Sequence, residues 1–156
     1  MACMAAAGAS LEVLQRRINV QTIGPDKINQ LRHVHFFKDM PGILAHMEKH
    51  AEILRPKFER AYAMLREGLA GTGANFTTPQ GGYFISIETP PGCAKRAWQL
   101  CKEAGVLITD AGATFPYGVD PKDSNIRFAP TFLAMDELEQ ALEVLCLSIR
   151  LAVCEA

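Results

Sequence analysis

The sequence predicts an α+β fold: a small, mostly antiparallel sheet with helices on one face, preceded by a long helix and an N-terminal helical arm. From Tyr83 onward the pattern runs strand, helix, strand, long loop, strand and helix, an order typical of an α+β sandwich. Upstream, apolar residues recur every three or four positions over 44–69, which predicts one long amphipathic helix. We therefore expect an arm and connector over 1–42 and a small domain over 43–156.

Two short helices are expected in the arm. Ser10 is a suitable cap for a helix over 11–17, and Asp26 for a second helix with apolar side chains at spacings of three. The run 40–42, Met-Pro-Gly, is expected to break the chain before the long helix. Gly68 should end the long helix.

Three strands are expected in the small domain, over 83–87, 106–109 and 125–129. A helix over 94–104 lies between the first two and stops at a glycine. The segment 110–124 contains two glycines and two prolines and is longer than most connections, which favours a functional loop.

The last helix is expected to start at Asp136 and Glu139, which have the spacing of a capping box. Apolar residues then recur at helical spacing, so one face of this helix should be buried. These residues are Leu138, Leu142, Leu145 and Ile149.

Arg127 lies between two apolar residues of the third predicted strand. Ile126 and Phe128 should bury one face, so alternation turns Arg127 to the other face, together with Asn125. An arginine held there can present its planar fork to a carboxylate. The alternative is a solvated arginine on an exposed sheet face.

Composition narrows the class of protein. The 156 residues are 49% hydrophobic with a net charge of −1, so a packed core is expected, with no electrostatic case for nucleic acid or an anionic membrane. No apolar run approaches the length of a transmembrane helix.

The five cysteines, Cys3, Cys93, Cys101, Cys146 and Cys154, contain no C-x-x-C pair, which favours reduced thiols in a cytoplasmic protein. His33 and His35 diverge on a helix, so a metal site is not expected.

Three blocks in order carry a family resemblance: 79–87 with its glycine pair, 104–115 beginning Ala-Gly-Val, and 124–129 with its Ile-Arg strand. This set resembles the C-terminal domain of fold-type I aminotransferases, which depend on pyridoxal phosphate. The run 21–34 resembles an atypical bacterial branch of aspartate aminotransferases. The resemblance implies that Arg127 binds the substrate α-carboxylate, and that the reaction passes an amino group between an amino acid, aspartate in this branch, and a 2-oxo acid.

The resemblance also implies something that this chain lacks. In the family a lysine beside a serine forms a Schiff base with the cofactor, just before a small-residue stretch that residues 1–8 resemble. None of the seven lysines has that context: Lys27, Lys38, Lys49, Lys57, Lys95, Lys102 and Lys122. We therefore expect no cofactor bound covalently to this chain, and a fragment that is inactive alone. Its partners would be the missing large domain and a second subunit of a homodimer.

Further substrate contacts are expected from the resemblance in the second helix, where a cation could meet the side-chain carboxylate of aspartate. The candidates are Lys27, Asn29, Gln30 and Arg32, and the alternative is a solvated surface helix. Asp110 and Thr114 could help to shape the pocket. A rival to the whole interpretation remains open, namely a standalone, non-catalytic α+β module that binds a small carboxylate or a protein partner.

Overall fold

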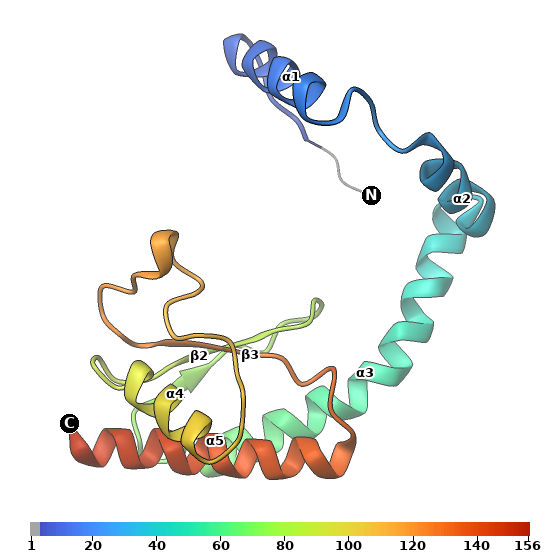
Figure 1. Cartoon of the computed structure of the whole chain (residues 1–156). Helices are drawn as coiled ribbons and strands as arrows, with labels where there is room; N and C mark the ends of the chain where they lie inside the picture. Colours follow the sequence, from blue (N-terminus) through green and yellow to red (C-terminus); the bar gives the residue numbers. More distant parts are fainter. Residues whose placement is uncertain (1–3) are drawn as a thin grey trace. The chain divides into compact units, whose positions relative to one another are not determined.

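The computed structural model describes residues 4–156 and confirms the α+β class (Figure 1). It contains five α-helices, one short 3-10 helix and a three-stranded sheet. The chain divides between His50 and Ala51 into two compact units, which we describe separately. The long helix α3, Met40–Gly68, contributes its beginning to the first unit and its end to the second.

The first unit holds α1, Ala9–Thr22, and α2, Lys27–Phe37. Helix α1 is longer than the expected 11–17. Asp26 caps α2 as expected, since its carboxylate accepts the backbone N–H of Asn29 at 2.9 Å. The expected break at Met-Pro-Gly 40–42 is wrong, because these residues form the first turn of α3. Proline is tolerated there, where its missing N–H has no helical partner, and Asp39 caps the turn by accepting the Gly42 N–H at 2.9 Å.

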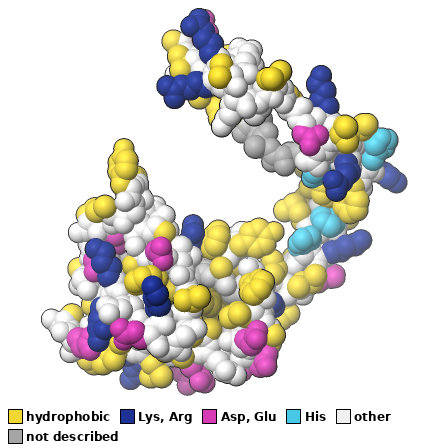
Figure 2. Space-filling view, in the orientation of Figure 1, with side chains coloured by type: hydrophobic (Ala, Val, Ile, Leu, Met, Phe, Trp, Pro, Cys, Tyr) yellow, Lys and Arg dark blue, Asp and Glu magenta, His cyan; other side chains and the backbone are white. Residues whose placement is uncertain are grey.

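Neither α1 nor α2 contains a buried residue. Large apolar side chains instead lie exposed along the first unit, and Figure 2 shows hydrophobic surface over these helices. The exposed residues include Leu11, Val13, Ile18, Ile28, Leu31, Val34, Phe36, Met40, Leu44 and Met47. This unit therefore buries little apolar surface of its own.

The second unit contains an antiparallel sheet in the order β1, β2, β3. The strands are β1, Asn75–Phe76, β2, Ile85–Glu88, and β3, Asn125–Phe128. The registers of β2 and β3 pair Ile85 with Phe128, Ser86 with Arg127, Ile87 with Ile126 and Glu88 with Asn125. Two of the three expected strands are therefore confirmed, with slightly different bounds.

The expected strand over 106–109 is wrong. The Val106 N–H bonds to Cys101 O at 2.8 Å, which closes the preceding helix, and the Ala113 N–H bonds to Asp110 O at 3.1 Å, which opens a turn. The few residues between have no strand partner, although Val106 and Ile108 still pack against the core. The two-residue strand β1 provides the third strand of the sheet.

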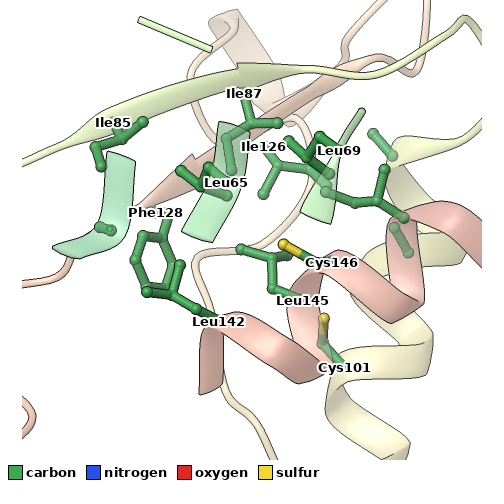
Figure 3. Close-up of a cluster of buried hydrophobic side chains, with 14 of the residues drawn as sticks. Leu65, Leu69, Ile85, Ile87, Cys101, Ile126, Phe128, Leu142, Leu145 and Cys146 are labelled. Carbon is green, nitrogen blue, oxygen red and sulfur yellow. The ribbon is translucent and has the colours of Figure 1, made fainter. Parts of the chain in front are cut away.

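One face of the sheet is sealed by α4, Ala94–Glu103, by α5, Met135–Glu155, and by the last turns of α3. Figure 3 shows Ile85, Ile87, Ile126 and Phe128 in one cluster with side chains of these helices. The four predicted core leucine and isoleucine residues of α5 are all fully buried. Helices α3 and α5 approach closely at Gly68, where an added Cβ would lie 2.5 Å from the Sγ of Cys146.

Helix α5 starts one step earlier than expected. Ala134 is its N-cap, and the carboxylate of Glu137 accepts the Ala134 N–H at 3.2 Å. The expected box of Asp136 and Glu139 is therefore wrong, because the chain already enters the helix at Met135. Glu139 instead forms an ion pair with Arg60 of α3, with Oε1 2.6 Å from Nε.

Candidate functional site

Arg127 lies on the sheet face opposite the core. Its neighbours Ile126 and Phe128 have 0% and 4% of their surfaces exposed, and both face the helices. Alternation along β3 then directs Arg127 to the other side, where its cross-strand partner is Ser86. The side chain is half-buried there. The position expected from the sequence pattern is confirmed, and the two buried neighbours fix the backbone that carries it.

The Arg127 guanidinium rests on an aromatic ring and has no polar partner among the described residues. Its Cζ lies 4.5 Å from the ring centroid of Phe84, the residue that directly precedes β2. The Nε–H is buried with no hydrogen-bond acceptor. Within residues 4–156 the guanidinium forms no ion pair. A buried donor without an acceptor is costly, so this site favours a ligand that brings acceptor oxygens.

A polar network lies beside the arginine on the same face. The side-chain amide of Asn125 donates to Ser86 Oγ at 2.8 Å and to a carboxylate oxygen of Glu88. The other oxygen of Glu88 accepts from Ser124 Oγ at 2.9 Å. Thr114 Oγ1 donates to Asn125 Oδ1 at 2.6 Å. The Glu88 carboxylate is therefore held by neutral donors, although a guanidinium lies on the same face.

Asp120 fixes the chain just before β3. Its buried carboxylate accepts the backbone N–H groups of Ser124 and Asn125 at 2.8 Å each, and that of Lys122 at 2.9 Å. Burial alone would raise the pKa of Asp120, but these backbone donors outweigh burial and lower the pKa below its ordinary value. The start of the arginine-bearing strand is thereby anchored by an ionised group.

The secondary candidates belong to the first unit, on α2. Lys27, Gln30 and Arg32 are exposed, and Asn29 is half-buried. The Lys27 and Arg32 side chains form no hydrogen bond or ion pair with another described residue. Because Arg127 belongs to the second unit, a joint site for these residues stays a prediction. Thr114 does take part in the network beside Arg127, whereas Asp110 contributes its backbone carbonyl to a turn.

Sequence reasoning missed three residues in the surroundings of Arg127 and its strand, namely Phe84, Glu88 and Asp120. The period-two alternation of β2 was the available signal, since it places 84, 86 and 88 on one face once Ile85 and Ile87 are assigned to the core. Nothing in the sequence gave the register that brings this face beside Arg127.

Other kinds of site receive no support from the described part of the chain. Residues 4–156 contain no cluster of three or more His, Cys, Asp or Glu able to hold a metal. No helix among them is long and apolar enough to cross a bilayer. Cys93, Cys101 and Cys146 are buried free thiols and Cys154 is an exposed one, while Cys3 lies outside the described residues.

Comparison by sequence with known proteins matches the chain to aminotransferases. A family model described as aspartate amino-transferase matches residues 1–156. An aspartate aminotransferase of Corynebacterium glutamicum is 43% identical over 137 residues, which are 87% of this chain and 32% of that protein. A protein of Mycolicibacterium smegmatis assigned to the aminotransferases is 44% identical over 137 residues, with the same coverage.

Solved structures agree with these matches. A protein of Corynebacterium diphtheriae assigned to the aminotransferases superposes with a TM-score of 0.84 at 45% identity, over 94% of this chain and 36% of that chain. The chain thus spans about a third of the length of the relatives that it matches.

Proposed function

Because the chain belongs to the aspartate aminotransferase family, we propose that it is the C-terminal part of a pyridoxal-phosphate-dependent aminotransferase and supplies the clamp for the substrate α-carboxylate. The observation that carries this proposal is the state of Arg127, which is half-buried and has a buried Nε–H without an acceptor and no ion pair within residues 4–156. A carboxylate satisfies such a fork with two parallel hydrogen bonds. Held at a fixed strand position, Arg127 would orient the substrate Cα–H bond for proton removal.

The cofactor is held, in this proposal, by the rest of the enzyme. Pyridoxal phosphate supplies the electron sink for amino-group transfer when it is bound. Lys57 of the second unit is already engaged, since its Nζ donates to the backbone oxygens of Thr131 at 3.0 Å and Leu133 at 2.6 Å. This chain's own contribution is to bind and align the carboxylate.

Aspartate is the amino donor that we propose, with a 2-oxo acid as acceptor in amino-acid metabolism. The exposed cations Lys27 and Arg32, with Asn29 and Gln30, would read the side-chain carboxylate. The name of the Corynebacterium glutamicum relative supports this choice of donor. The assignment requires α2 to reach the substrate in the assembled enzyme.

The exposed apolar surface of the first unit supports partners for this chain. Large exposed apolar patches usually mark interaction sites. We propose that this surface packs against the large domain of the same enzyme and against a second subunit in a homodimer. The free thiols among the described cysteines support a cytoplasmic setting for that dimer.

The proposal is tested by kcat/KM for aspartate and alanine in the full-length enzyme. Arg127→Lys keeps the charge but loses the planar fork, so kcat/KM should fall for both donors by roughly 10- to 100-fold, the scale of a charged hydrogen bond. Lys27→Ala and Arg32→Ala should reduce aspartate turnover more than alanine turnover. If Arg127→Lys turns over both donors like the wild type, Arg127 is a solvated arginine and the proposal fails.

The isolated 156-residue chain provides a second test. It should show no aspartate:2-oxoglutarate turnover above a boiled control, because the amine that holds the cofactor is proposed to lie elsewhere. Turnover by the purified chain would contradict that assignment.

A further inference from the structure

Glu88 is a carboxylate of the protein itself that lies within reach of the proposed substrate clamp. It occupies the same sheet face as Arg127, because Ser86 pairs with Arg127 and Glu88 pairs with Asn125 in the antiparallel register. Glu88 and Arg127 are thus diagonal neighbours, a relation in which Cα atoms lie about 7–8 Å apart and long side chains can meet. An ion pair between them would occupy the fork that a substrate carboxylate needs.

The structure shows Glu88 engaged elsewhere. One carboxylate oxygen accepts from the Asn125 side-chain amide, and the other accepts from Ser124 Oγ at 2.9 Å. Asn125 is itself oriented by Thr114 Oγ1, which donates to its Oδ1 at 2.6 Å, so that its amide nitrogen faces Ser86 and Glu88. Both carboxylate oxygens of Glu88 are therefore held by Ser124 and Asn125 at the start of β3, and Glu88 forms no ion pair with Arg127.

From this geometry we infer that Asn125 and Ser124 are positioning residues that hold Glu88 off Arg127 and so keep the guanidinium free for an incoming carboxylate. The inference rests on the proposed function, since a free fork matters only if Arg127 binds a carboxylate. Neutral donors suit this task, because they bind the carboxylate without adding a charge beside the arginine. Loss of the Asn125 amide would release an exposed glutamate with a cation as its next neighbour.

The side-chain Nε–H signal of Arg127 in the 156-residue chain measures both parts of the inference. The signal is identified by its absence from Arg127→Lys, and sodium acetate is the probe, titrated at ionic strength held constant with sodium chloride. In the wild type the signal should move saturably with acetate. In Asn125→Ala we expect about two- to five-fold weaker acetate binding, the scale of one exposed ion pair in competition. Ser124→Ala removes only the hydroxyl donor and leaves the Asn125 amide bonded to both Ser86 and Glu88, so it should weaken acetate binding less.

Rescue separates this role from a merely structural one. Glu88→Gln in the Asn125→Ala background should restore acetate binding to within about two-fold of the wild type, because an amide competes poorly for the guanidinium. Glu88→Gln alone should bind acetate as the wild type does. Amide spectra of each variant establish that it is folded. If Asn125→Ala unfolds, the same comparison is made with Ser124→Ala in the presence and absence of Glu88→Gln.

Two results would overturn the inference. The first is weakening of acetate binding by the same factor with and without Glu88→Gln. The second is an identical ligand-free Arg127 signal in Asn125→Ala and in the double variant. Failure of the proposed function looks different: the wild-type signal would not respond to acetate, while the ligand-free signals of the two variants would still differ.

Discussion

Phe84 should control how well Arg127 holds a carboxylate. The ring centroid lies 4.5 Å from the guanidinium carbon, inside the roughly 6 Å range of a cation–π contact. At a half-exposed site such a contact contributes about 0.5–1 kcal/mol, which corresponds to about a two- to five-fold change in affinity. Phe84→Leu keeps an apolar side chain but removes the ring. We therefore expect acetate binding at Arg127 to weaken by that factor.

The assay is again the Arg127 Nε–H signal under acetate titration. Phe84→Tyr keeps the ring and should bind acetate like the wild type. Phe132→Leu is the matched control, since Phe132 is 92% exposed and makes no ring contact with a described residue. Removal of the Phe84 ring should also shift the ligand-free signal, because the ring current is lost. Equal acetate affinities for Phe84→Leu and Phe132→Leu would refute the positioning role of the ring.

Three further outcomes concern stability and reactivity. Because its pKa is lowered in the folded chain, Asp120 stabilises the fold at neutral pH, and that stability is lost as the pH falls through the folded-state value. Below about pH 4 the free energy of unfolding, measured with urea, should therefore fall more steeply with pH for the wild type than for Asp120→Asn. The same pH dependence in both proteins would contradict this. Gly68→Ala should lower the free energy of unfolding by about 1–3 kcal/mol, because its Cβ would overlap Cys146 and the opposing gain in helix propensity is under about 1 kcal/mol. A variant more stable than the wild type would show that α5 moves to make room for the methyl group. Burial raises the pKa of Cys146 to about 11, so iodoacetamide at pH 8 should modify exposed Cys154 and spare Cys146 until urea is added, as peptide mass spectrometry would show; equal labelling would contradict the burial.

The sequence correctly predicted the elements in which apolar residues recur at a regular spacing and the two faces differ in polarity. Helix α5 repeats buried leucine and isoleucine residues from Leu138 to Ile149, over about three turns. Strand β3 places Ile126 and Phe128 on the face opposite Arg127, so the assignment of faces needed no tertiary information. The segment 106–109 misled because it has strand composition. Val106 and Ile108 do pack against the core. The backbone, however, leaves the preceding helix at 106 and enters a turn at 110, so it pairs with no neighbouring strand. Strand β1 has only two residues, too few for any periodic signal.

The candidate site divides in the same way. Strand alternation was enough to predict the face on which Arg127 lies, and the family resemblance supplied its predicted role as a carboxylate ligand. The roles of Phe84, Glu88 and Asn125 depend on cross-strand register and on amide orientation, which the sequence does not encode locally. The helix cap at Ala134 was missed for a related reason, since alanine has no capping side chain and the glutamate at 137 supplies the bond instead. The α2 candidates stay predictions, because they belong to a different compact unit.

The pairing of β2 with β3 has a consequence for folding errors. A slip of one residue would move Arg127 into the hydrophobic cluster and turn Ile126 and Phe128 outward, because side chains alternate strictly along a strand. Such a chain would bury an unpaired charge, and a state of that kind is too unstable to accumulate. Mispairing of these strands should therefore yield unfolded protein, and never a folded chain in which Arg127 occupies a different position.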